Sequence, residues 1–107
     1  MKQKHLAAAD RRAEILEIAL MLSRVKGYHN VTREELATMS NCSPSLISAR
    51  FGTMSHLRRA IMSAAIASED VRVLAQGLAH REAKALAAPL ELRQAAAATL
   101  VKDVAPC

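Results

Sequence analysis

Apolar residues recur every three or four positions along most of the chain, and no segment alternates apolar and polar residues as a half-buried strand would. The first such stretch opens near Asp10, a good N-cap residue, and stops at Gly27. Its expected apolar side consists of Ile15, Ile18, Ala19, Leu22 and Val25. The pattern therefore predicts an all-α protein that begins with a long amphipathic helix.

A short helix is predicted next. Residues 32–35 form a capping box, in which the Thr32 hydroxyl accepts from the Glu35 N–H and the Glu35 carboxylate reaches back to the N–H of Thr32. Ser40-Asn41 ends this helix, because Asn tolerates the left-handed conformation that a sharp turn requires. Its small apolar face is expected to consist of Leu36, Ala37 and Met39.

A second short helix follows within a few residues. Ser43 is a good N-cap, and Pro44 suits the first helical position, where its missing N–H costs nothing. Gly52 closes the segment. The expected inward face consists of Leu46, Ile47 and Phe51. The unit from Thr32 to Phe51 has the dimensions of a DNA-binding helix-turn-helix.

The pattern predicts three further helical segments in the rest of the chain. The first, with Thr53 or Ser55 as its N-cap, runs to about residue 67. Ser68-Glu69-Asp70 is typical of a new helix start, and Pro89 separates that helix from a last one over residues 90–102. The expected fold is therefore all-α: a three-to-four-helix bundle with the helix-turn-helix, followed by two short C-terminal helices.

Positive charge is concentrated in the first half of the chain. The sequence has 15 Lys and Arg against 10 Asp and Glu, which gives a net charge of +5. Residues 1–60 hold ten of the basic and five of the acidic side chains, whereas residues 61–107 hold five of each. A polyanion such as nucleic acid is therefore the expected partner, and its surface is expected in the first half.

The outer face of the second short helix suits insertion into a DNA groove. It is expected to present Pro44, Ser45, Ser48, Ala49 and Arg50. Small polar side chains fit between the phosphate backbones, and serine hydroxyls, an alanine methyl and one arginine are compatible with base reading. We therefore expect these side chains at base edges, with Thr32 and Arg33 on phosphates. Tyr28, by contrast, is expected to pack over the first helix.

From Arg12 to about Ile61 the chain resembles the N-terminal DNA-binding domain of TetR-type transcriptional regulators. The family pattern has an apolar helix ending in Gly, a helix opened by Val-Thr with an acidic residue and Ala, and a recognition helix ending in Phe before a Gly-Ser-Lys-like turn. The matching segments here are residues 15–27, 31–37 and 43–54. The resemblance implies a DNA-binding domain over residues 10–67. The expected DNA-binding residues are Thr32, Arg33, Ser43, Pro44, Ser45, Ser48, Ala49, Arg50, Thr53, Arg11 and Arg12.

The chain departs from the family pattern at three places. Asn41-Cys42 stands where the family turn usually carries Gly and an apolar residue, Ser48 replaces a common Tyr, and Met54 replaces a common Lys. The last two changes remove expected phosphate contacts. We expect basic residues elsewhere to supply these contacts. Some lie on an N-terminal arm over residues 1–9 or just after it, and others lie at the start of the fourth helix. The candidates are Lys2, Lys4, Arg11, Arg12, Arg58 and Arg59.

Residues 68–107 are expected to form a helical dimerisation tail. Only 47 residues follow Ala60, which is short for a domain that encloses a drug-sized cavity, so no inducer pocket of the family's kind is expected. A homodimer would bring two recognition helices onto the half-sites of a palindromic operator. By the family resemblance, repression is favoured over activation.

The sequence argues against catalysis and against a membrane location. It carries no nucleophile elbow, Gly-rich phosphate loop or metal-ligand cluster, so no enzyme activity, cofactor or metal is expected. Cys42 and Cys107 are too few and too far apart for a disulfide framework, and no run of about 20 apolar residues occurs. A cytoplasmic protein is the expectation. The alternative function is a small helical interaction module, such as an antirepressor or adaptor that binds another regulator.

Overall fold

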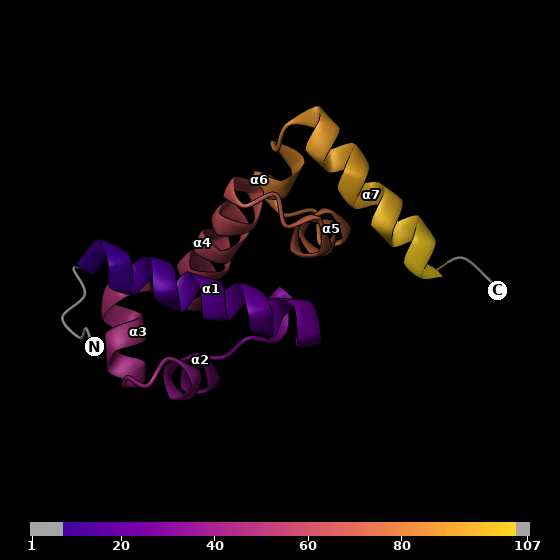
Figure 1. Ribbon diagram of the computed structural model, residues 1–107. Coiled ribbons are helices and arrows are strands. Elements are labelled where there is room, and N and C mark those ends of the chain that lie inside the picture. The colour runs from indigo at the N-terminus through magenta and orange to yellow at the C-terminus, as the bar shows by residue number, and fades with distance from the viewer. Residues whose placement is uncertain (1–7, 105–107) are drawn as a thin grey trace, which may run out of the picture.

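The computed structural model describes residues 8–104, and this part of the chain contains helices and no strand (Figure 1). The expected all-α class is confirmed. The helices are α1 (Ala8–Lys26), the short 3-10 helix η1 (Tyr28–Asn30), α2 (Arg33–Met39), α3 (Pro44–Phe51), α4 (Met54–Ala67), α5 (Val71–Ala79), α6 (Ala83–Leu86) and α7 (Leu90–Val104). Lys2, Lys4 and Cys107, named above, lie outside the described residues.

Short polar side chains define where several of these helices begin. The hydroxyls of Thr32, Ser43 and Thr53 accept from backbone N–H groups three residues on, each at 3.1 Å, at the starts of α2, α3 and α4. The sequence left Thr53 and Ser55 as alternatives for α4, and Thr53 is the cap. The expected capping box forms only in part. The Glu35 carboxylate accepts from Lys26 Nζ at 2.8 and 3.0 Å instead of turning back to Thr32.

Three helices end in the same left-handed turn. Asn41, Glu69 and Arg81 have φ angles of 58°, 56° and 57° after α2, α4 and α5, respectively. In each turn, two backbone N–H groups fold back onto the last carbonyls of the helix, as when Cys42 N donates to Ala37 O at 2.9 Å. The left-handed Asn41 was expected. The other two positions carry residues that give no turn signal, because they are neither Gly nor Asn.

The expectation of two helices after α4 is wrong, because three are present between α4 and residue 104. The left-handed turn at Arg81 divides the expected single helix into α5 and α6. Within the predicted start Ser68-Glu69-Asp70, the N-cap of α5 is Asp70, whose carboxylate accepts from Val73 N at 3.2 Å. Pro89 precedes α7, as predicted.

One core joins the helix-turn-helix to the C-terminal helices. It takes buried side chains from α1–α3, from α4 and from α5–α7, among them Ile15, Leu36, Ile47, Ile61, Leu74 and Ala96. In Figure 1, α2 and α3 lie below α1, and α4–α7 lie above it, with α7 packed on α5. α5 contacts both α1 and α4, so the C-terminal helices pack directly on the first half of the chain.

The buried side of α1 differs from the expected one. Ile15 and Ala19 are fully buried, as predicted, but Val25 is 82% exposed. Leu16, Leu20 and Ser23 are buried in its place, since α1 packs against α4 and α5 as well as α2. Met39 is likewise 50% exposed rather than part of the inward face of α2.

Candidate nucleic-acid interface

The helix-turn-helix is built as the sequence predicted. Asn41 takes the left-handed conformation between α2 and α3, and Ser43 caps α3 with Pro44 in its first turn. The expected inward residues Leu36, Ala37, Ile47 and Phe51 are buried, and Leu46 is half-buried. Apolar side chains thus form the contact of α3 with the core, and the opposite face of α3 is exposed.

That free face is small and uncharged. The side chains of Pro44, Ser45, Ser48 and Ala49 are exposed, as is the capping residue Ser43. None is longer than a few atoms, so the α3 backbone can approach another surface closely. A DNA major groove admits an α-helix of this kind, and serine hydroxyls can donate to or accept from base edges.

Arg50 lies at the flank of α3 instead of on its exposed face. It is half-buried, and its Nε is buried without a hydrogen-bond partner among the described residues. The cause is helical periodicity: Arg50 lies one turn beyond Leu46, on the side that turns toward α1 and α4. The sequence placed Arg50 beside Ser45 and Ser48, and this part of the expectation needs correction.

The residues expected on phosphates lie at the edges of the same surface. Thr32 and Thr53 are exposed, but both hydroxyls already cap helices. Arg33 is half-buried and reaches across to the carbonyl of Gly52 at 3.5 Å, a long contact. Its buried Nε has no partner within residues 10–100. Arg33 thus spans the start of α2 and the end of α3, the two elements that border the free face.

Arg11 has an internal role that the sequence did not indicate. It donates to the carbonyl of Ser40 at 2.7 Å and pairs with Glu14. Ser40 is the C-cap of α2, where helix carbonyls carry partial negative charge. Arg11 therefore ties α1 to the end of α2, so its guanidinium is not a free phosphate contact as expected.

Arg12 lies over an aromatic ring. Its guanidinium carbon is 5.0 Å from the centroid of Phe51, the last residue of α3. This cation–π distance is within the attractive range of about 6 Å. The planar charged group thereby covers the end of α3 from the side of α1 while remaining largely exposed to solvent.

Tyr28, His29 and His80 form a cluster of rings, of which the sequence predicted only the packing of Tyr28. Tyr28 is buried, as predicted, and its hydroxyl lies 3.1 Å from His29 Nε2. The rings of His29 and His80 stack with centroids 3.9 Å apart. Burial raises the pKa of Tyr28, whereas desolvation and the adjacent His80 lower the pKa of His29. The two histidines are far apart in the sequence, so their spacing carries no signal.

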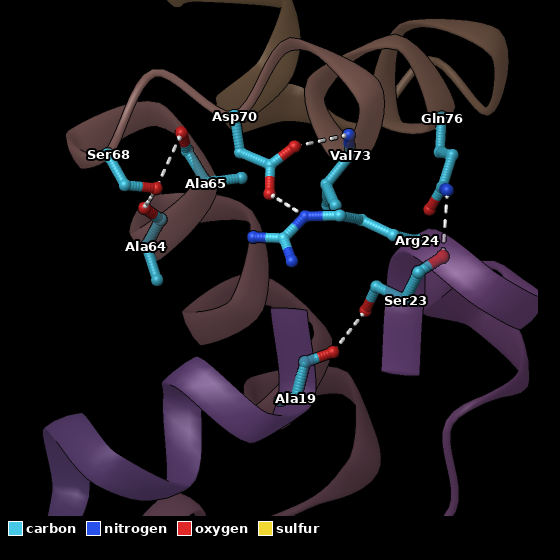
Figure 2. A network of polar contacts seen from close by, with 9 residues as sticks. All are labelled: Ala19, Ser23, Arg24, Ala64, Ala65, Ser68, Asp70, Val73 and Gln76. Atoms are coloured by element: carbon cyan, nitrogen blue, oxygen red, sulfur yellow. Dashed lines mark hydrogen bonds and ion pairs between the residues drawn. The ribbon is translucent and has the colours of Figure 1, made fainter. Parts of the chain in front are cut away.

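The end of α1 is joined to α5 by polar contacts between side chains and backbone. Gln76 Nε2 donates to the carbonyl of Ser23 at 2.9 Å, and Gln76 Oε1 accepts from the Tyr28 N–H at 2.8 Å. Figure 2 shows Gln76 and Ser23 beside the ion pair of Arg24 with Asp70. One amide side chain thus bridges the turn at Gly27 that leads into α2.

The described residues contain no group of three His, Cys, Asp or Glu side chains placed to hold a metal ion. Between residues 8 and 104, every helix is too short or too polar to cross a membrane. Cys42 is a free, half-buried thiol in the turn between α2 and α3.

Comparisons with protein-family models, with curated proteins and with solved structures return no match for this chain.

Proposed function

We propose that this protein binds double-stranded DNA site-specifically through α3 and regulates transcription. The observation that carries the proposal is the contrast between the two faces of α3. Ile47 and Phe51 are buried on one face, and Pro44, Ser45, Ser48 and Ala49 are exposed on the other. A helix held by its apolar side and bare on its small polar side can enter the major groove. The excess positive charge of residues 1–60 favours approach to DNA.

The proposed mode of action is repression by a cytoplasmic homodimer on a palindromic operator. Two exposed apolar side chains on the C-terminal helices, Leu86 (42%) and Leu90 (59%), support a second copy as the partner of this region. Sedimentation of the wild type and of the Leu86→Lys/Leu90→Lys variant tests this part. A dimer that the double substitution converts to a monomer is expected, and a wild-type monomer at high micromolar concentration would contradict it.

The test of DNA binding is selection from a randomised duplex pool, followed by anisotropy titration of the enriched duplex at about 50 and 200 mM salt. We expect an enriched palindrome whose affinity falls steeply over this range. Ala49→Glu places a carboxylate on the free face of α3 and should weaken binding at least tenfold. The matched control is Ala98→Glu, because Ala98 is also an exposed helical alanine but lies on α7.

The two variants distinguish α3 from the rest of the surface. Equal affinity of Ala49→Glu and wild type, or equal losses in both variants at unchanged oligomeric mass, would show that α3 does not read DNA. The second candidate function, an interaction module for another protein, is favoured by the exposed apolar pair Met21 (45%) and Val25 (82%), one turn apart on α1. It would gain support if no motif were enriched from the pool.

A further inference from the structure

A basic hollow lies where α1, α3, α4 and α6 meet. Its volume is about 490 Å³. Four cationic side chains line it, one from each of these helices: Arg12, Arg50, Arg59 and Lys84. His56 also borders it, and no acidic residue does. α6, which carries Lys84, lies beside α4 in Figure 1.

The positive charge in this hollow has no internal counter-charge. Within residues 10–100, the ion pairs are those of Arg11, Arg24 and Lys26, and none involves the four lining cations. Arg50 in addition leaves its Nε buried without an acceptor. Arg12, Arg59 and Lys84 are exposed, so solvent screens their mutual repulsion, and an anion bound among them would reduce it further. Among the described residues, the buried Nε of Arg50 lacks the partner that buried polar groups ordinarily have.

Apart from Ser63, the remaining wall of the hollow is apolar. Leu16, Phe51, Ala60 and Ala64 contribute to it. Arginine presents a planar fork of donors that matches the oxygens of a phosphate, and lysine adds a point charge. A cavity of several hundred Å³ with an apolar wall and a few charged groups has the size and character of a small-molecule site. The chemistry suits a phosphate group attached to an apolar or planar body.

We propose that this hollow binds a small phosphate ester, with the phosphate among the lining cations Arg12, Arg50, Arg59 and Lys84 and the organic part against Ala60 and Ala64 of α4. Binding itself does not depend on the proposed DNA function. Because Arg50 and Phe51 end α3, an occupant would contact the helix that we propose reads DNA, and this link does rest on that function.

Phosphate chemistry could come from a small ester or from the DNA backbone, and the experiment separates the two sources. The first arm is calorimetric titration of the full chain, without DNA, with adenosine 5′-monophosphate and with inorganic phosphate. The ester should bind saturably and at least tenfold more tightly than inorganic phosphate, because only the ester contacts the apolar wall. Arg59→Gln/Lys84→Gln should weaken ester binding at least tenfold.

Arg72→Gln is the matched control, since Arg72 is an exposed cation on α5 that does not line the hollow. It should leave ester binding unchanged. The proposal is overturned if the ester shows no saturable binding, or if Arg72→Gln weakens it as much as the double variant does. Circular dichroism of each variant establishes that the helical content is retained.

The second arm measures duplex affinity against salt for the same variants. If Arg59→Gln/Lys84→Gln lowers the salt dependence of duplex binding while the ester does not bind, the hollow contacts backbone phosphates and the small-ligand proposal is wrong. If the ester binds but no duplex motif is enriched, the result supports the phosphate-ester site and contradicts the proposed DNA-binding function. The two failures are therefore distinguishable.

Discussion

The guanidinium of Arg24 donates to the carboxylate of Asp70 at 2.7 Å and joins the last turn of α1 to the start of α5 (Figure 2). The other carboxylate oxygen of Asp70 accepts from the N–H of Val73 at 3.2 Å and caps α5. The Asp70 side chain is only 7% exposed, whereas that of Arg24 is 43% exposed. One carboxylate thus both caps the start of α5 and attaches this helix to α1.

Substitutions at Asp70 should separate these two roles. Asp70→Ala removes cap and ion pair, and we expect it to lower the free energy of unfolding by about 2 kcal/mol. Asp70→Asn retains a capping oxygen and should cost less than about 1 kcal/mol, similar to Arg24→Gln. Urea denaturation measures all three. Equal losses for the Ala and Asn variants would show that the cap contributes nothing.

Gly77→Ala should destabilise the fold although alanine favours helix. A Cβ at Gly77 would lie 2.6 Å from Met62 Cε and 2.8 Å from Ala85 Cβ. Overpacking of this kind costs about 1–3 kcal/mol, against a gain in helix propensity of about 1 kcal/mol. We expect a net loss in thermal stability. Adding Ala85→Gly should reduce the cost of Gly77→Ala, and identical costs in both backgrounds would contradict the close approach of α5 and α6.

Arg81→Gly should stabilise the protein. Arg81 has a φ of 57° in the turn between α5 and α6. A left-handed conformation costs a non-glycine residue about 1–2 kcal/mol. Glycine avoids this cost, but the greater conformational entropy of glycine in the unfolded chain offsets part of the gain. The expected net gain is about 0.5–1 kcal/mol. Arg81→Ala removes the same side chain without relieving φ and should show no gain, so a gain there would implicate the charge instead.

Stability should fall as the pH is lowered from about 7.5 to 5.5. Burial, then His80 and Arg58, lower the pKa of His29 below its ordinary value of 6.5, although His29 is exposed and only partly desolvated, with Glu82 opposing them. The unfolded chain binds this proton more readily, so the contribution is complete above pH 6.5 and is lost as the pH falls toward the folded-state pKa.

The variant for this test is His29→Phe, which retains a ring against His80 but does not titrate. Its melting temperature should vary less with pH than that of the wild type. His56→Gln, at the start of α4 and away from the stacked pair, should keep the wild-type slope. If His29→Phe also keeps the wild-type dependence of melting temperature on pH, His29 is not the source of that dependence.

Arg11→Ala should affect stability more than DNA binding. Arg11 donates to the carbonyl of Ser40 at the end of α2, and a charge-assisted bond of this kind contributes about 1 kcal/mol or more. We expect a lower melting temperature and an unchanged salt dependence of duplex affinity. A reduced salt dependence at full stability would instead assign Arg11 to a phosphate.

Much of the candidate site follows from local sequence. The caps Thr32, Ser43 and Thr53 act on backbone groups three residues away, so neighbouring residues suffice to predict them. Asn41 likewise marks the turn of the helix-turn-helix by its own conformational preference. The free face of α3 follows from helical periodicity once Ile47 and Phe51 are identified as apolar anchors.

The errors share a physical cause. Val25 is apolar and in phase with Leu22, yet it is 82% exposed. The Glu35 carboxylate accepts from Lys26 instead of from the N–H at the start of its own helix. Arg11 donates to the carbonyl of Ser40, 29 residues away in the sequence. A charged side chain has several partners of similar energy, and the packed helices decide which of them lies within reach.

By itself, then, the sequence determined an all-α fold, most helix starts and a helix with one free polar face, because these depend on interactions within one or two turns. Only the tertiary structure decided that Arg81 ends α5, that His29 stacks on His80, and that four cations from four helices surround one hollow. These features depend on contacts between residues distant in the chain, and such contacts exist only once the shared core has brought the helices together.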